Sequence, residues 1–319
     1  MKNKFYTLLY IDKSEKKRMS TTGINKAKDL NFQERINIFL GCAALLDKSL
    51  QYNQVGNLNI LTNDKEFVDN SLQKRGFRIN VIDLSFSLHV PHDINFYSAH
   101  FKIDVFKYLG GVNSDEVSFL LDNDVVCTNS LPKLITQIEE ADYNERKRPL
   151  LIYQMPRYGG ERMVHDKQKV DPSQIHGLWA GGEFIAGTAA VYADLYNEIM
   201  KIQEGYWNTY KTLFHQGDEM LTSVALERMF YGCQHPILDA HGLGLIKRYW
   251  SILDKEPFYK EDYWLVHLPY DKGMVSSLNL NSINSNEDFE REYKSYWNKL
   301  IIKKHLRKIA TWFRNLAKK

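Results

Sequence analysis

The feature that most constrains the fold is an alternation of short apolar runs with longer segments of helical periodicity over the first 140 residues. The apolar runs have strand length and lie at 5–12, 58–64, 77–84 and 117–127. The segments with apolar residues every three or four positions lie at 32–50, 98–109 and 131–141. Asn63 and Asp64 can cap a helix after the second run. Repeated strand–helix–strand units predict an α/β fold with a mostly parallel central sheet and helices on both faces.

The second half of the chain is less regular. We expect a strand at 149–155, a loop over the cleft at 156–178, a helix at 218–230 and a strand leading into a loop at 263–273. Within 179–202 the sequence predicts a glycine-rich turn, a short strand and a helix, and the polar segment 13–30 is expected to be a loop. No Pro/Gly/Ser-rich linker divides the chain. We therefore predict a single domain at 1–290, with halves that meet near residue 130, and a tail at 291–319.

Two carboxylates follow the fourth apolar run. Asp122 and Asp124, one residue apart in LLDNDVV, end what looks like a buried strand. Ligands of parallel sheets bind beyond the carboxyl ends of the strands, and alternate residues of an extended chain point the same way. Neighbouring carboxylates repel unless a cation neutralises them, and their oxygens suit Mg²⁺ or Mn²⁺. The pair is thus a candidate metal site, and the alternative is a turn-forming or helix-capping role.

Composition places the chain among ordinary globular proteins, with 44% hydrophobic and 25% charged residues. Cys42, Cys127 and Cys233 form no CxxC pair, and we expect them to be buried free thiols in a reducing compartment. The sequence shows no signal peptide and no apolar stretch of the ~20 residues that a membrane span needs. These features predict a cytoplasmic protein.

The tail has an unusual charge. Nine Lys or Arg and no acidic residue lie between Tyr293 and Lys319, whereas the whole chain has a net charge of +3, so the remainder carries −6. Apolar residues at helical spacing are Ile302, Leu306, Ile309, Phe313 and Leu316, with Trp312 beside them. The basic residues Lys303, Lys304, Arg307, Lys308 and Arg314 occupy the other faces. This pattern predicts an amphipathic helix that binds an anionic membrane surface through 293–319. The alternative is a helix docked on its own domain. No recognition motif for nucleic acid accompanies the charge.

Several segments in this order resemble the GT-A-fold glycosyltransferases that use nucleotide sugars, and most closely the retaining families 8 and 6. The resemblance extends over about residues 5–273 and rests on FYTLLYID, LTND, SAHFKIDVFKYL, LLDNDVV, WAGGEFIAG, HQGDEMLTSVAL and VHLPYDKG. The chain departs from family 8 at the last segment, where DKGM replaces the Gly-x-Lys-Pro-Trp ending.

The resemblance implies a metal-dependent transfer of a sugar from a nucleotide sugar, most often a UDP-sugar, to a cell-surface glycan such as lipopolysaccharide or capsule. It implies a nucleotide-binding half at about 1–130, an acceptor-binding half at about 131–290, and a position at the inner face of the cell membrane. The cofactor would be Mn²⁺ or Mg²⁺, held by Asp122, Asp124 and His267. The donor would be bound by Tyr10, Asp12, Lys102, Asp122, Asn123 and Lys272. The donor and acceptor pocket would use Trp179, Gly181, Gly182 and Glu183, and the catalytic residues would be Asp218 and Glu219.

Structural explanations for these residues stay open at this point. Asp218 and Glu219 also suit a helix N-terminus, where negative charge is stabilised by ~0.3–1 kcal/mol. His267 in an apolar strand and Lys102 on a helix have ordinary structural roles as well.

Two other functional classes fit the fold. One is a nucleotidyltransferase or other sugar-nucleotide enzyme, although only Gly23 follows the first strand where a glycine-rich loop is needed. The other is a non-catalytic glycan- or membrane-binding protein.

Overall fold

The computed structural model of the chain describes residues 4–12, 30–112, 116–140, 148–155, 160–232, 235–254 and 256–316, with the backbone alone at 139–140, 304, 307–308 and 313–316. These residues form one seven-stranded sheet, of order β3-β2-β1-β4-β7-β6-β8, and one three-stranded sheet, of order β5-β10-β9. The loop expected at 13–30 lies outside the described residues except for its last position.

The large sheet is mostly parallel, as the strand–helix alternation predicts. Its strands are β3 (Asn80–Asp83), β2 (Leu58–Thr62), β1 (Lys4–Leu8), β4 (Ser118–Leu121), β7 (Ala180–Gly187), β6 (Leu150–Gln154) and β8 (Ile237–Asp239). Neighbouring strands pair in parallel, except that β7 runs antiparallel to both β4 and β6. Every residue of β4 and β7 is buried, which is the pattern of strands covered on both faces. The predicted α/β class is confirmed.

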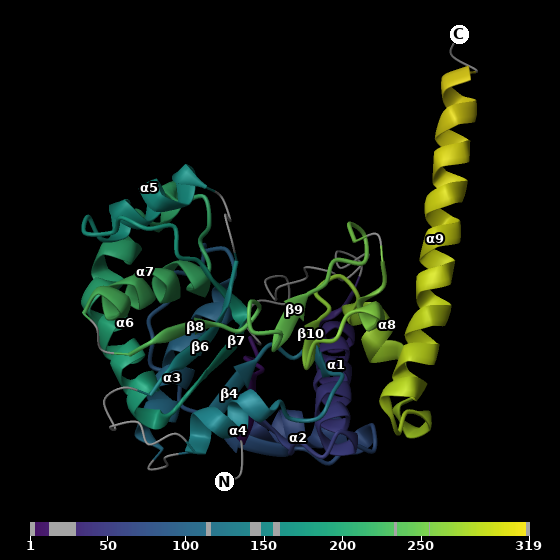
Figure 1. Ribbon diagram of the computed structural model, residues 1–319, viewed down its shortest axis with the longest axis horizontal. Helices are drawn as coiled ribbons and strands as arrows, with labels where there is room; N and C mark the ends of the chain where they lie inside the picture. The colour runs from purple at the N-terminus through teal and green to yellow at the C-terminus, as the bar shows by residue number, and fades with distance from the viewer. Residues whose placement is uncertain are drawn as a thin grey trace.

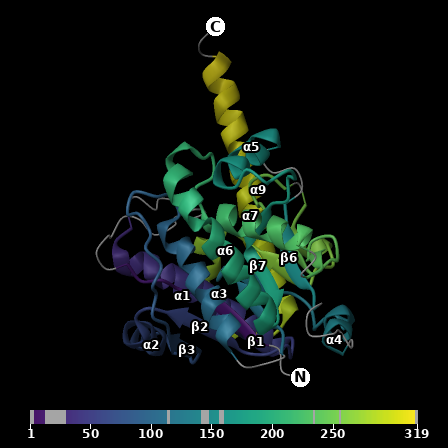
Figure 2. The ribbon, with the colours of Figure 1, turned by 90° about the vertical axis from the view of Figure 1, so that its left-hand side faces the viewer.

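Helices cover the sheet on two sides. Figure 1 shows α3 (Lys102–Gly111), α6 (Ala189–Thr209) and α7 (Asp218–Tyr231) on one side, and α1 (Phe32–Tyr52) and α8 (Lys272–Ser277) on the other. Figure 2 looks onto the first of these sides. The other helices are α2 (Lys65–Lys74), α4 (Lys133–Glu140), α5 (Glu161–Val170) and α9 (Asn286–Leu316), with 3₁₀ turns η2 (Tyr97–Phe101), η4 (Tyr210–Thr212), η5 (Phe258–Lys260) and η6 (Leu280–Ser282).

Side chains fix the ends of two early helices. The Asn31 side chain accepts from the Glu34 N–H, and the Glu34 carboxylate accepts from the Asn31 N–H, so a capping box starts α1. Asp64 caps α2 by accepting from the Phe67 N–H, as predicted. Asn63 does not share in this cap. Its side-chain amide instead bonds the backbone N–H and C=O of Ile11, which ties the segment after β1 to the end of β2.

The fourth strand differs from the prediction. Residues 117–127 form β4 in the large sheet and a separate strand, β5 (Val125–Cys127), in the small sheet. The break is a turn in which the Val125 N–H donates to the Asp122 carbonyl at 3.2 Å. Both strands are fully buried, so an apolar run alone cannot reveal that they belong to different sheets. The two aspartates therefore lie in a turn between sheets rather than along one extended strand.

Two further expectations in the second half are wrong. The segment 156–178 contains α5, with residues 156–159 outside the described part of the chain. Its buried apolar residues are only Met163 and Val170, so its periodicity is weak in sequence. The helix is held instead by Lys167, which is fully buried, pairs with Glu227 and donates to two backbone carbonyls. Gly181 and Gly182, expected in a turn, lie within β7.

The small sheet joins distant parts of the chain. In it β10 (Leu265–His267) pairs antiparallel with β5 and parallel with β9 (Ile246–Arg248). The segment 263–273, predicted as a strand leading into a loop, forms a strand that ends at His267, and its last two residues begin α8. A core cluster connects this sheet to α1 and to the first half of α9, through Val126, Val266, Phe289, Tyr293 and Trp297. The predicted tail is thus not separate, because residues 291–316 belong to one continuous helix whose first half is packed in this core.

Two expectations from composition can be compared with the described residues. Cys42 and Cys127 are buried and free, as predicted, whereas Cys233 lies outside the described residues. None of the helices in the described ranges combines the length and the apolar character needed to cross a bilayer.

Candidate active site

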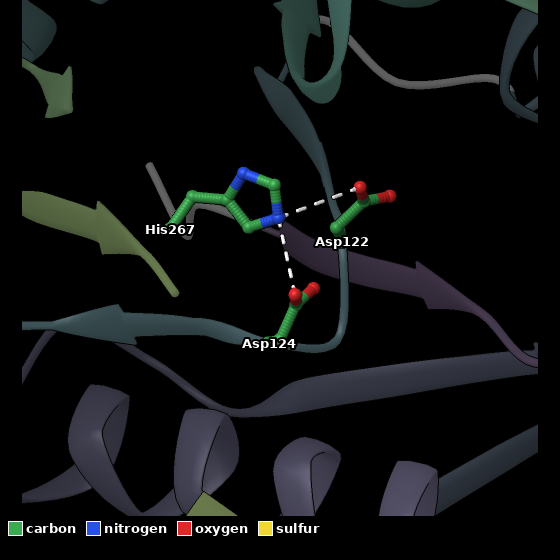
Figure 3. A group of neighbouring side chains, drawn as sticks. All are labelled: Asp122, Asp124 and His267. Atoms are coloured by element: carbon green, nitrogen blue, oxygen red, sulfur yellow. Dashed lines mark hydrogen bonds and ion pairs between the residues drawn. The ribbon is translucent and has the colours of Figure 1, made fainter. Parts of the chain in front are cut away.

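The turn between β4 and β5 brings three potential metal ligands together. The Asp124 Oδ2 lies 3.1 Å from the His267 Nε2, and the Asp122 Oδ2 lies 3.9 Å from the same nitrogen. Figure 3 shows both carboxylates directed at one edge of the imidazole, which stands at the end of β10. One ligand atom from each residue falls within 4.8 Å of the others. Two carboxylate oxygens and one imidazole nitrogen form a donor set that suits Mn²⁺ or Mg²⁺.

The charges around this triad are strongly coupled. Burial opposes the charge on His267, but Asp124 outweighs it and raises the pKa of His267 to about 9. Burial also opposes the charge on Asp124, yet Lys272 and His267 hold the pKa of that carboxyl well below its usual range. Lys272 pairs directly with Asp124 through its Nζ. Because a ligating imidazole must be neutral, cation binding here would release the proton of His267.

Glu183 supports the other side of His267. Its carboxylate is fully buried and accepts from the Arg248 Nε at 2.6 Å and the Arg248 Nη2 at 2.5 Å. Burial raises the pKa of Glu183, but Arg248 more than reverses this effect and lowers it to about 2. The His267 Nδ1 lies 3.5 Å from the Glu183 Oε1. A carboxylate behind a ligating imidazole fixes its orientation, so Glu183 suits the outer partner of a metal site.

Lys102 connects the triad to the start of α7. Its Nζ donates to the Asp122 Oδ1 at 2.8 Å and to the Gly182 carbonyl at 2.8 Å, and lies 3.6 Å from the Asp218 Oδ2. Burial lowers the pKa of Lys102, but Asp122 and Asp218 more than compensate and the net shift is upward. Position 182 must be small, because a Cβ there would lie 2.8 Å from the Lys102 Nζ. The glycine in β7 therefore makes room for a buried ammonium group.

Asp218 and Glu219 are adjacent in the chain but lie in different environments. Glu219 accepts from the Trp179 indole N–H at 3.0 Å and from the Gly182 N–H at 3.0 Å, and lies 3.3 Å from the Arg248 Nη2. The Asp218 Oδ2 is buried and has no hydrogen-bond partner among the described residues. Burial raises the pKa of Asp218 to about 6. Glu219 is thus held by hydrogen bonds, whereas the buried Asp218 Oδ2 accepts none among the described residues and lies 3.6 Å from the Lys102 Nζ.

These groups surround a pocket of about 320 Å³. The predicted site residues that line it are Tyr10, Lys102, Asp122, Asn123, Asp124, Gly182, Asp218, Glu219, His267 and Lys272. Asp12 is buried outside the lining, and Trp179, Gly181 and Glu183 lie behind the pocket wall. Gly181 is needed for close packing there, since a Cβ would fall 2.1 Å from the Glu183 Oε2.

The pocket also contains residues that sequence reasoning missed. Arg248, Trp250, His215 and Phe96 all line it. Arg248 stands in the three-residue strand β9, which has no hydrophobic pattern, and no spacing relates it to Glu183, 65 positions away. HQGDE does place His215 three residues before Asp218, which is the one signal that could have revealed it.

Comparisons with known proteins found similar structures but no similar sequence. No family model matches the chain, and no curated protein matches its sequence. A galactosyltransferase, LgtC, in complex with donor and acceptor sugar analogues, is 13% identical, with 86% of this chain and 96% of that chain covered and a TM-score of 0.48. Mouse xyloside xylosyltransferase 1 is 10% identical, with 83% and 97% covered and a TM-score of 0.47. An active-site mutant of LgtC is 13% identical, with 83% and 86% covered and a TM-score of 0.44. These proteins are glycosyltransferases, the class that the motifs resemble, but the case for function rests on the side chains described above.

The chemistry of the pocket follows from its charges. The Asp122, Asp124 and His267 triad, the ammonium groups of Lys102 and Lys272 and the guanidinium of Arg248 all line one space. Such a set suits a ligand with several negative charges, such as a diphosphate bridged by a divalent cation. The carboxylate of Asp218 lies on the Lys102 side of this space, with its Oδ2 3.6 Å from the Lys102 Nζ. The pocket can therefore bind a polyanion and present a carboxylate to the group attached to it.

Proposed function

We propose that the protein is a metal-dependent glycosyltransferase that moves a sugar from a nucleotide sugar, a UDP-sugar, to a glycan acceptor. The observation that carries the proposal is the meeting, in one pocket, of the Asp122, Asp124 and His267 triad with the Asp218 carboxylate, whose Oδ2 accepts no hydrogen bond among the described residues. Lys102 bridges the two groups. This combination is needed where a diphosphate must leave while a sugar is transferred.

Each residue has a proposed part in this reaction. Asp122, Asp124 and His267 would hold Mn²⁺ or Mg²⁺, which supplies charge stabilisation to the departing diphosphate. Lys102 and Lys272 would bind phosphate oxygens, and Tyr10 and Asn123 would line the nucleotide side. Asp218 would face the reacting carbon, where a carboxylate can stabilise positive charge that develops on the sugar. Glu219, held by Trp179 and Gly182, would keep α7 in register with β7.

The proposed acceptor is a cell-surface glycan such as lipopolysaccharide or capsule, and the proposed site of action is the inner face of the cell membrane. The support is the second half of α9. Of its apolar stripe, Ile302, Leu306 and Ile309 are between 51% and 60% exposed, as is Trp312 beside them. Lys303 is also exposed, whereas the side chains of Lys304, Arg307, Lys308, Phe313, Arg314 and Leu316 lie outside the described part. A basic helix with an exposed apolar stripe suits an anionic lipid surface.

The test combines donor binding with turnover. Purified protein is incubated with a panel of nucleotide sugars, with Mn²⁺ or with EDTA, and thermal stabilisation and donor hydrolysis are measured. We expect one donor to raise the unfolding temperature only when Mn²⁺ is present. Asp124→Asn should abolish that shift, and Asp218→Asn should keep it while lowering turnover by at least ~100-fold, since it removes a charge that acts in the transition state. Asp69→Asn, which alters a surface ion pair with Lys65, is the matched control.

The alternatives predict other results. Activity that persists unchanged in EDTA would exclude the metal role. A nucleotidyltransferase would instead release pyrophosphate from a nucleoside triphosphate and a sugar phosphate. A non-catalytic glycan- or membrane-binding protein of the same fold would hydrolyse none of the donors under any condition.

A further inference from the structure

Phe96 has a backbone conformation that its side chain disfavours. Its φ of 59° and ψ of 32° lie in the left-handed region, just before η2. Bulky residues rarely adopt this region, and such strain costs about 1–3 kcal/mol. A glycine would make the same turn without this cost. The turn alone therefore does not explain why position 96 is a phenylalanine.

The ring does not serve the hydrophobic core. Phe96 is 43% exposed, whereas the neighbouring Tyr97 and Phe101 are buried in an aromatic group with Tyr10 and Phe86. Phe96 lies against a different element. It stacks on His215 with ring centroids 5.3 Å apart and planes 12° apart. A strained and half-exposed aromatic residue that lines a pocket is typical of a binding site.

The position of the ring is fixed from two sides. The Asn95 side-chain amide donates to the Gln216 side chain at 3.0 Å, which ties the segment before η2 to the segment before α7. His215, behind the ring, meets the edge of Trp179 at 5.1 Å. Phe96 also lies next to the start of α7, since its Cδ2 is 3.5 Å from the place a Cβ would take on Gly217. The ring is therefore preorganised beside Asp218.

An apolar ring beside carboxylates matches the chemistry of a sugar. A pyranose has a face of C–H groups, which packs on an aromatic ring, and a rim of hydroxyls, which donate to carboxylates. Phe96 offers the ring, and Asp218 offers an acceptor oxygen in the same pocket. We propose that Phe96 is the stacking platform for the sugar ring that receives the transferred group. This inference rests on the proposed function and adds the acceptor subsite to it.

The competing ligand for the Phe96 ring is the nucleobase of the nucleotide-sugar donor. Tyr10, after β1, also lines the pocket, as do Leu8, Leu9 and Phe39. These residues offer an apolar surface, and the Tyr10 ring is stacked on Phe101 at 3.9 Å. Phe96 is absent from the ring contacts of Tyr10 among the described residues. The stacking on His215 thus assigns Phe96 to the Asp218 side.

The test uses simple sugars as acceptor probes. Methyl β-D-galactoside and methyl β-D-glucoside are added to the protein loaded with Mn²⁺ and UDP. Saturation-transfer NMR then reports which C–H groups of the sugar contact the protein. We expect a signal from one face of a sugar ring with the wild-type protein, a fall of about 5- to 10-fold in affinity for Phe96→Ala, and near-normal binding for Phe96→Tyr. Phe230→Ala removes an exposed ring, 54% accessible against 43% for Phe96, from the far end of α7 and should change nothing.

A second measurement separates binding from folding. Phe96→Gly should keep or raise the unfolding temperature, because glycine adopts positive φ without steric cost. Mn²⁺-dependent UDP affinity should stay unchanged in all Phe96 variants.

Three results would overturn the proposal: no sugar signal with the wild-type protein, equal signals for wild type and Phe96→Ala, or a loss of UDP affinity that marks a donor-side ring. Failure of the wild type to bind UDP with Mn²⁺ at all would instead reject the proposed function itself.

Discussion

The two halves of α9 have the same backbone and opposite surroundings. In the first half Phe289, Tyr293 and Trp297 are no more than 4% exposed and pack in the cluster that joins α1 to the small sheet. In the second half every described side chain from Ile302 to Trp312 is exposed. Figures 1 and 2 both show this half extending beyond the rest of the molecule. One helix can therefore be part of a domain core and, farther along, a free amphipathic surface.

The first half also reaches the candidate active site. The Tyr293 hydroxyl donates to the Asp271 Oδ2 at 2.6 Å, and the Tyr296 hydroxyl donates to the Asp271 Oδ1 at 2.9 Å. Ser251, next to the pocket residue Trp250, donates to the same carboxylate at 2.7 Å. Asp271 directly precedes Lys272, which pairs with Asp124. The predicted boundary at 290/291 falls inside this helix, and the division of the chain there stays a prediction.

The largest expected difference between the halves is in folding. A chain cut before Asn286 loses three buried aromatic side chains, each worth about 3–5 kcal/mol, which together match the whole stability of an ordinary domain, about 5–15 kcal/mol. We expect this chain to be unfolded, and a chain cut before Lys299 to unfold only slightly below the full-length protein, since it loses only the half-buried Leu300 and Ile301 from the cluster. Thermal unfolding followed by circular dichroism compares them. Equal unfolding temperatures for both truncated forms would show that the first half contributes no core.

The next effect concerns the second half alone. The cut before Lys299 removes eight basic residues, and each contributes about 1 kcal/mol near an anionic bilayer, so contact by half of them gives about 4 kcal/mol, or roughly a thousandfold in affinity. We expect the truncated form to stop sedimenting with vesicles that contain phosphatidylserine.

A matched pair of full-length variants tells charge from apolar contact in this binding. Changing Lys303, Lys304, Arg307 and Lys308 to Gln should leave weaker binding that depends less on salt, because half of the basic residues are gone. Changing Leu306 and Ile309 to Ser should leave weaker binding that depends more on salt, because salt screens only the charged part. Equal sedimentation of truncated and full-length protein would favour a helix docked on its own domain.

The smallest expected effect links the first half to the pocket. Tyr293→Phe removes one donor from a buried carboxylate and should lower the free energy of unfolding by about 1–3 kcal/mol. Because Asp271 precedes Lys272, we also expect the affinity for UDP to fall a few-fold with Mn²⁺ present. Denaturant unfolding and UDP titration measure these changes. Tyr259→Phe is the control, since its ring packs in the same cluster without donating to Asp271 among the described contacts. An unchanged UDP affinity would separate α9 from the site.

Sequence patterns predicted the elements better than the contacts between them. The parallel sheet follows from local alternation, and Asp122 and Asp124 face one nitrogen of His267 as expected for a shared ligand. The extended geometry predicted for Asp122 and Asp124 is wrong. The buried strands β4 and β5, on either side of the turn, have the same run of apolar residues that one continuous strand would have. Glu183, expected in the pocket, is paired behind its wall. Arg248 and α5 depend on buried ion pairs with residues far along the chain, for which no spacing rule exists.

The position of the metal triad between distant strands also determines at which stage of synthesis and folding it can form. Val125 lies opposite His267 in the β5–β10 pair, 142 positions along the chain, and such non-local pairs form slowly because a long loop must close first. A nascent chain that ends between β8 and β10 contains every described strand of the large sheet and both aspartates, yet it lacks the imidazole. Ion binding would then report the synthesis of β10 and its pairing with β5 rather than the formation of the main sheet.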